Sequence, residues 1–117
     1  MFRKLALVSV LTFIPFVAAS ADPPGGPITG VTRVKAYSSN VHAVFYNGGE
    51  QADFAIVGDG DTTLNLIVTD QFGREIVRTR GPGDRAHVSW NVRFGATYYI
   101  RVVNEGPVYN EYTYRAY

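Results

Sequence analysis

Apolar and polar residues alternate with a period of two along much of this chain. In residues 51–57 and 64–69, every second residue is apolar and faces one side, namely Ala52, Phe54, Ile56, Leu64, Leu66 and Val68. Successive side chains of an extended strand point to opposite faces, so this alternation is typical of a strand with one buried side. No segment beyond residue 21 has a helical period of useful length. We therefore expect an all-β fold with essentially no helix.

Turn signals divide the chain at regular intervals. Four-residue, glycine-bearing turns begin at Asn47, Gly58, Asp70, Gly81, Arg93 and Asn104, so 11 or 12 residues separate successive starts. Short strands spaced in this way predict an antiparallel β-sandwich of about seven or eight strands. The expected strands are 31–37, 41–46, 51–57, 63–70, 74–79, 86–92 and 97–103, with a last strand that contains Tyr112 and Tyr114 and a turn at 38–40.

Two finer expectations follow from these turns. Asp70 and Gly73 suit a type I turn with a left-handed glycine, so strands 63–70 and 74–79 should pair directly, with Ile76 pointing into the core. If every turn reverses the chain, successive turns alternate between the two ends of the sandwich. The turns at 58, 81 and 104 then share one end, and those at 47, 70 and 93 share the other.

The first 21 residues have the pattern of a secretory signal peptide. Arg3 and Lys4 precede the apolar run 5–18, and Ala19-Ser20-Ala21 supplies the small residues of a cleavage site before Asp22. The run is shorter than a membrane-spanning helix requires, and Pro15 interrupts it. We expect residues 22–30 to form a Pro/Gly-rich flexible leader and 31–117 a single domain, in a protein that is secreted or periplasmic.

Charge and cysteine content exclude several classes of function. Removal of Arg3 and Lys4 lowers the basic count from 11 to 9 against 10 acidic residues, a formal charge of −1. A chain without a basic stripe is not expected to bind nucleic acid or to dock on anionic lipid. The sequence has no cysteine, so its core must be stable without disulfides, and thiolate metal sites are excluded.

Several segments together resemble one bacterial family. The runs are 45–50 (FYNGGE), 58–68 (GDGDTTLNLIV), 70–73 (DQFG), 96–102 (ATYYIRV) and 112–114 (YTY). They are similar to the pre-peptidase C-terminal domain over roughly residues 41–116. The resemblance implies a secreted jelly-roll β-sandwich of the kind appended to extracellular peptidases, in a family where some members bind calcium and relatives on collagenases bind collagen.

The chain differs from that family in two respects. Where the family has an acidic Asp-x-Asp-Leu pattern, this chain has Thr63 and Asn65, which removes two carboxylates from the central strand. No peptidase domain precedes the module, so we expect it to act as a free-standing protein.

A calcium site is the first candidate for chemistry. The end that collects the turns at 58, 81 and 104 would gather four carboxylates, Asp59, Asp61, Asp84 and Glu105. Loop carboxylates are the hard oxygen ligands that calcium selects. The alternative is that Asp and Gly serve only the local hydrogen bonding of tight turns, with Arg80 and Arg85 balancing the charge and no cofactor bound.

A ligand surface is the second candidate. Tyr46, Tyr99 and Arg101 are expected on an outer sheet face, where tyrosine and arginine suit the recognition of a glycan or a protein. The alternative is that tyrosine is simply a good strand former. Trp90 shares a face with Val88 and Val92 and is expected in the core.

Catalysis is not expected. The histidines are His42 and His87 alone, and no nucleophile elbow or zinc-binding His-Glu-x-x-His motif occurs. His87 and Ser89 lie on one outer face, as ordinary solvated residues do. We expect a monomeric, non-catalytic module that binds an extracellular polymer or protein, and the alternatives are a structural module of the cell envelope that pairs through exposed edge strands or a regulator of a separately encoded peptidase.

Overall fold

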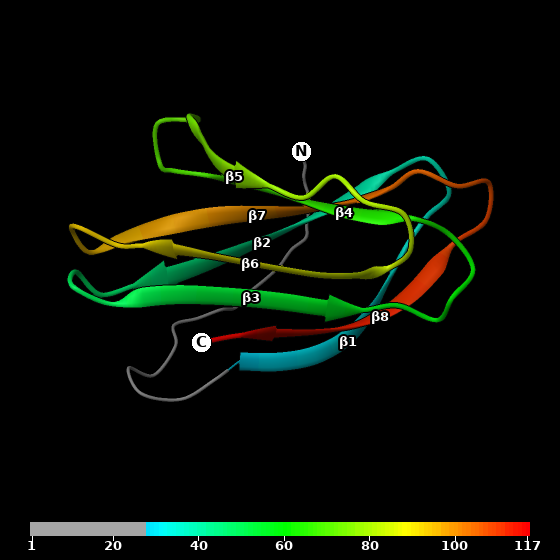
Figure 1. The fold of residues 1–117 in the computed structure, drawn as a ribbon, viewed down its shortest axis with the longest axis horizontal. Coiled ribbons are helices and arrows are strands. Elements are labelled where there is room, and N and C mark those ends of the chain that lie inside the picture. Colours follow the sequence, from blue (N-terminus) through cyan, green and yellow to red (C-terminus); the bar gives the residue numbers. More distant parts are fainter. Residues whose placement is uncertain (1–27) are drawn as a thin grey trace.

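The computed structural model describes residues 28–117 as eight strands in two antiparallel sheets. The strands are β1 (Ile28–Val34), β2 (Ser39–Tyr46), β3 (Gln51–Val57), β4 (Leu64–Thr69), β5 (Glu75–Arg78), β6 (Arg85–Asn91), β7 (Ala96–Asn104) and β8 (Asn110–Ala116). Figure 1 shows the two layers packed face to face with the loops gathered at the two ends. The expected β-sandwich is confirmed.

The strand order is that of a jelly roll. One sheet has the order β1-β8-β3-β6 and the other β2-β7-β4-β5. Every connection crosses to the other sheet except the β4–β5 hairpin, which is the double Greek-key arrangement of an eight-stranded jelly roll. None of residues 28–117 is helical, and the described part has no helix that would cross a membrane.

The buried faces match the alternation of the sequence. Phe54 of β3, Leu66 of β4 and Ile100 of β7 are fully buried between the sheets. Trp90 is 7% exposed and packs against Tyr46 and Tyr98, so its expected place in the core is confirmed. Burial of these apolar faces supplies about 25 cal/mol for each Å² removed from water, without any disulfide.

The first strand lies earlier than expected. β1 begins at Ile28, within the predicted leader, and pairs with β8 from Ile28 opposite Ala116 onward. Gly30 pairs with Tyr114 in this strand, and glycine suits the position because the Tyr114 ring occupies the space that a Cβ would need. The leader boundary at residue 30 is therefore wrong, and the signal peptide and the remainder of the leader lie outside the described residues.

The turn after β1 also differs from the expectation. The chain reverses at Ala36 and Tyr37, and Tyr37 adopts a left-handed φ of 51°. Ser39 and Asn40 already belong to β2, so the turn predicted at 38–40 is displaced toward the N-terminus. Serine and asparagine favour turns in general, but here pairing with β7 holds both in the strand.

β4 and β5 pair directly, as expected from the turn at Asp70. Gly73 has a φ of 84°, and its N–H donates to the Asp70 carbonyl. However, the register shifts by one residue between Val68 and Thr69, so Val77 lies opposite Val68. Val77 therefore packs against the core and Ile76 is 41% exposed, which reverses the predicted orientation of Ile76.

The turns alternate between the ends of the sandwich as predicted. At one end Gly48 lies against Arg93 and Gly95. At the other, the Gly58 N–H donates to the Asp84 carbonyl, and the Glu105 N–H donates to the Thr63 carbonyl.

Candidate functional site

The outer face of the β2-β7-β4-β5 sheet carries exposed aromatic, aliphatic and arginine side chains. The register places Val41 of β2 beside Arg101 of β7, which in turn lies beside Ile67 of β4. Tyr99 lies two residues from Arg101 on β7, and Phe45 lies near the end of β2. We call this set, Val41, Phe45, Ile67, Tyr99 and Arg101, the tyrosine–arginine face.

Water reaches much of this face. Val41 is 48% exposed, Phe45 51% and Tyr99 40%. Arg101 is exposed and is held in place by a hydrogen bond of 3.0 Å from its guanidinium to the Ser39 hydroxyl. Exposed tyrosine and arginine are enriched at recognition surfaces, where each combines an apolar body with hydrogen-bonding groups.

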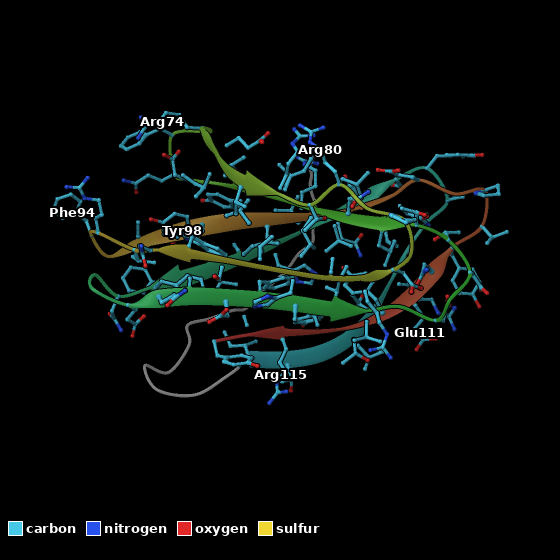
Figure 2. The ribbon with its side chains drawn as sticks, in the orientation of Figure 1. Arg74, Arg80, Phe94, Tyr98, Glu111 and Arg115 are labelled. Carbon is cyan, nitrogen blue, oxygen red and sulfur yellow. The ribbon has the colours of Figure 1, made fainter. Side chains whose placement is uncertain are left out.

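An open depression of about 540 Å³ continues the face toward β5. Its floor and walls come from β4, β5, β7 and the loop after β5, with the lining Asn65, Ile67, Arg78, Thr79, Arg80, Gly81, Pro82, Val103 and Glu105. Figure 2 shows Arg80 projecting away from the sandwich at this side. The depression therefore adds further polar and charged groups beside the tyrosine–arginine face.

Hydrogen bonds order two of the charged groups in the depression. The Arg78 guanidinium donates to both carboxylate oxygens of Glu75, at 2.6 and 2.9 Å, and this bond lowers the pKa of Glu75. The Glu105 carboxylate accepts a bond of 2.9 Å from the Asn65 amide. Ordered polar groups beside exposed aromatic rings can bind a ligand rich in hydroxyl or amide groups.

Tyr46 does not belong to this surface. It is 5% exposed and packs edge-on against Trp90, and its hydroxyl donates to the Asp53 carbonyl at 3.1 Å. Burial, together with the nearby Asp53 and Glu50 carboxylates, raises the pKa of Tyr46. The prediction that placed Tyr46 with Tyr99 and Arg101 is wrong, because the inward positions of β2 are the even-numbered ones.

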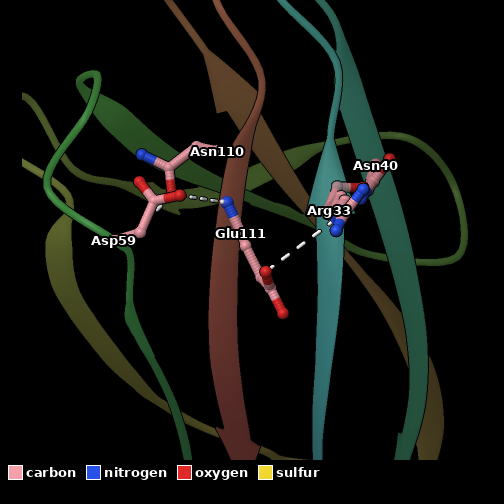
Figure 3. A network of polar contacts seen from close by, with 5 residues as sticks. All are labelled: Arg33, Asn40, Asp59, Asn110 and Glu111. Carbon is pink, nitrogen blue, oxygen red and sulfur yellow. Dashed lines mark hydrogen bonds and ion pairs between the residues drawn. The ribbon is translucent and has the colours of Figure 1, made fainter.

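The four candidate calcium ligands lie at one end of the sandwich, as expected. Their carboxylates do not converge on one point, because Asp59, Asp84 and Glu105 each accept hydrogen bonds from separate donors. The Asp59 carboxylate accepts the N–H groups of Asp61 and Glu111, both at 3.0 Å. Figure 3 shows Asp59 turned toward the Glu111 backbone, and Glu111 in turn lies 3.8 Å from Arg33. The bond from Glu111 is the main cause that lowers the pKa of Asp59.

Asp84 is also bonded within the loops. Its carboxylate accepts the Gly60 N–H at 2.6 Å and the Asn110 amide at 3.0 Å. Glu105 bonds to Asn65 instead, and Asp61 contributes its backbone N–H to Asp59. Across residues 28–117, no three His, Cys, Asp or Glu side chains come together in a group that could hold a metal ion.

The histidines and serines have no catalytic arrangement in the described part of the chain. The His87 ring bonds to Asp53 at 2.8 Å, and Ser89 accepts a bond from Gln51 at 3.2 Å. His42 lies between the sheets, bonded to the Tyr112 hydroxyl at 2.8 Å. A nucleophile hydrogen-bonded to a base is what a Ser–His mechanism requires, and neither histidine has such a partner among residues 28–117.

Sequence reasoning did not identify Val41, Phe45 or the depression as parts of the site. The alternation in β2 would have placed Val41 and Phe45 on the face opposite Val44 and Tyr46. The depression had no local signal in the sequence, because residues of β4, β5, β7 and the loops after β5 and β7 form it together.

Comparison with known proteins adds no relative. No protein-family model matches the sequence, and none of the curated proteins searched matches it.

Proposed function

We propose that this protein is a non-catalytic binding module of the pre-peptidase C-terminal type, which acts outside the cytoplasm and binds an extracellular polymer or protein. The tyrosine–arginine face is its binding surface. The observation that carries this proposal is the clustering of exposed Tyr99, Arg101, Val41 and Phe45 on one sheet face, beside an open polar depression. Exposed aromatic and aliphatic side chains that gather with arginine on one face are typical of an interaction site.

The outer face of the other sheet, β1-β8-β3-β6, is less suited to binding a ligand. Its outer side chains are largely charged or polar, including Arg33, Glu111, Arg115 and His87. Arg33 pairs with Glu111, and His87 pairs with Asp53. Surface pairs of this kind satisfy one another in water and offer little apolar area to a ligand.

Binding to immobilised extracellular polysaccharides and matrix proteins, followed by titration of the strongest binder, tests the proposal. Tyr99→Ala and Arg101→Ala are each expected to weaken binding by about ten-fold or more, as interface tyrosines and arginines typically do. The chain offers matched controls on the other face, Tyr117→Ala and Arg115→Ala, which should bind like the wild type.

Binding to polysaccharides and binding to matrix proteins are measured separately, so the experiment also shows which of the two ligand classes the protein binds. Equal loss of binding in both pairs of variants would reject the tyrosine–arginine face as the site. Binding to neither class by the folded protein would reject the proposed function.

A further inference from the structure

The four edge strands of the sandwich differ in how they are protected from pairing with other chains. Edge strands expose unpaired backbone groups, and charge, short length or a bulge normally protects them. β5 has four residues, two of them charged, and β4 pairs with it through a bulge. β6 carries Arg85 and β1 carries Arg33.

β2 has none of these protections. It is eight residues long, SNVHAVFY, and contains no charged residue and no proline. It pairs with β7 in an unbroken register from Ser39 to Tyr46. On its other side, no strand within residues 28–117 pairs with it.

The hydrogen bonding identifies which groups of β2 remain free. The Asn104 N–H of β7 donates to the carbonyl of Ser38, just before β2, at 2.8 Å. The backbone N–H and C=O groups of the even-numbered residues of β2 therefore point toward β7. Hydrogen-bonded and non-bonded pairs alternate in an antiparallel ladder. The backbone groups of Ser39, Val41, Ala43 and Phe45 therefore point to the open edge.

We propose that β2 is a homodimer interface, in which β2 of a second copy adds antiparallel to this edge about a two-fold axis at Ala43. In this register Ala43 faces Ala43 of the other copy, and each Val41 faces a Phe45. The absence of charge on β2 means that its two copies meet no like-charge repulsion across the axis, and Ala43 places no bulky side chain beside the axis. A two-fold interface must be self-complementary in this way.

The dimer would join two tyrosine–arginine faces into one surface. The sheet order becomes β5-β4-β7-β2 continued by β2-β7-β4-β5 of the second copy, with Val41 and Phe45 at the seam. This part of the inference rests on the proposed function, whereas the dimer does not. The proposed dimer differs from the monomer that we expected from the sequence. The sequence pattern did not indicate which strands lie at the sheet edges.

Sedimentation equilibrium over a range of concentrations tests the dimer. The wild-type chain should dimerise, and Ala43→Pro should weaken the dimer by about ten-fold or more, a loss of about 1.4 kcal/mol or more. Proline removes an N–H that points to the open edge and leaves the ladder to β7 intact. Val41→Lys, which places a charge on the exposed edge, should act in the same direction.

Val31→Lys is the matched control. Val31 is a 62% exposed valine on β1, the neighbouring edge strand of the other sheet. This variant should dimerise like the wild type. A thermal melt of each variant shows that it folds, and if Ala43→Pro does not fold, Val41→Lys decides the question.

Cross-linking tests the register. The chain has no cysteine, so Ala43→Cys introduces a single thiol, and directly opposed residues of a bonded pair have Cα atoms about 5.5 Å apart, within the reach of a disulfide. Ala43→Cys should oxidise to a covalent dimer, and Val31→Cys should not.

Three results would overturn the inference: a wild-type monomer at all concentrations, a dimer that resists both β2 variants, or equal cross-linking at positions 31 and 43. Neither experiment uses a ligand, so failure of the dimer is distinguishable from failure of the proposed function.

Discussion

Asn104 and Asn110 are buried, with 1% and 0% of their surfaces exposed. The Asn104 amide donates to the carbonyls of Val34, Lys35 and Val108, and its side-chain oxygen accepts the Gly106 N–H. In this way one side chain satisfies backbone groups that the loops leave without strand partners. Buried polar groups cost free energy unless they are paired, so each asparagine is required where it lies.

Asn110→Ala is expected to lower the free energy of unfolding by about 2–4 kcal/mol. The Asn110 side chain accepts the Asp59 N–H and donates to Thr62 and Asp84, so its removal leaves partly buried groups unpaired around a fully buried position. Urea denaturation at neutral pH measures the change. Asn91→Ala, at an exposed position of β6, is the control and should change stability little. Equal effects of the two variants would contradict this role.

His42 is a partly buried ionisable base on the inner face of β2, in contact with aromatic rings of the core. Its ring lies 4.3 Å from the Tyr114 ring and 5.5 Å from the Phe54 ring, measured between centroids. Burial lowers the pKa of His42 to about 4. The ring is therefore neutral in the folded protein near neutral pH, and the Tyr112 hydroxyl is its bonding partner.

Stability should fall as the pH is lowered from about 6.5 to about 4. The unfolded chain binds a proton on His42 near the ordinary pKa of 6.5, whereas the folded chain binds it only near pKa 4. In this window the unfolded state holds more protons, so the loss reaches at most about 3 kcal/mol. Urea denaturation at pH 7.5 and 4.5 measures it.

His42→Gln should reduce this acid dependence, while His87→Gln, at an exposed histidine, should keep it. Carboxylates that titrate in the same window affect all three proteins alike, so the difference between the variants isolates His42. The same acid loss in both variants would contradict the assignment.

At the scale of the elements, close approach between loops decides where glycine is needed. Gly58 directly follows β3, and a Cβ there would overlap the carboxylate of Asp84 and the side-chain oxygen of Asn110. Gly81, in the loop between β5 and β6, has open space around it and no left-handed φ. The same residue type therefore has different roles in two neighbouring turns.

Gly58→Ala is expected to lower the free energy of unfolding by about 1–3 kcal/mol, because the added methyl group displaces two hydrogen-bonded side chains. Gly81→Ala should be neutral or stabilise by up to about 1 kcal/mol, since alanine restricts the unfolded chain. Thermal and urea unfolding compare them, and a Gly58→Ala protein as stable as Gly81→Ala would refute the crowding argument.

At the scale of the whole molecule, the jelly roll separates a loop end rich in carboxylates from the tyrosine–arginine face, which exposes Phe45 and Tyr99. The carboxylates of Asp59 and Asp84 each accept two bonds from nearby backbone or side-chain donors. Calcium would have to replace these donors and to assemble six or more oxygens. The loops therefore have a use for these carboxylates that needs no cation.

Millimolar calcium is expected to leave the melting temperature unchanged, because binding to the folded state alone would raise it. Scanning calorimetry with calcium, and with chelator as the control, measures this. A rise that Asp59→Asn or Asp84→Asn abolishes would instead establish the calcium site that the sequence suggested.

The sequence determined the strand content, the alternation of the turns between two ends and most of the buried faces, because a period of two and turn chemistry are local properties of the chain. It placed Phe54, Leu66 and Trp90 correctly for that reason. The reversed Ile76 and the early start of β1 depended on pairing with distant strands, which local patterns do not contain. Tyr46 was misplaced because tyrosine suits either face of a strand, and packing against Trp90 decides between them. The tyrosine–arginine face, the depression and the open edge of β2 exist only because the jelly-roll order sets β2, β7, β4 and β5 side by side.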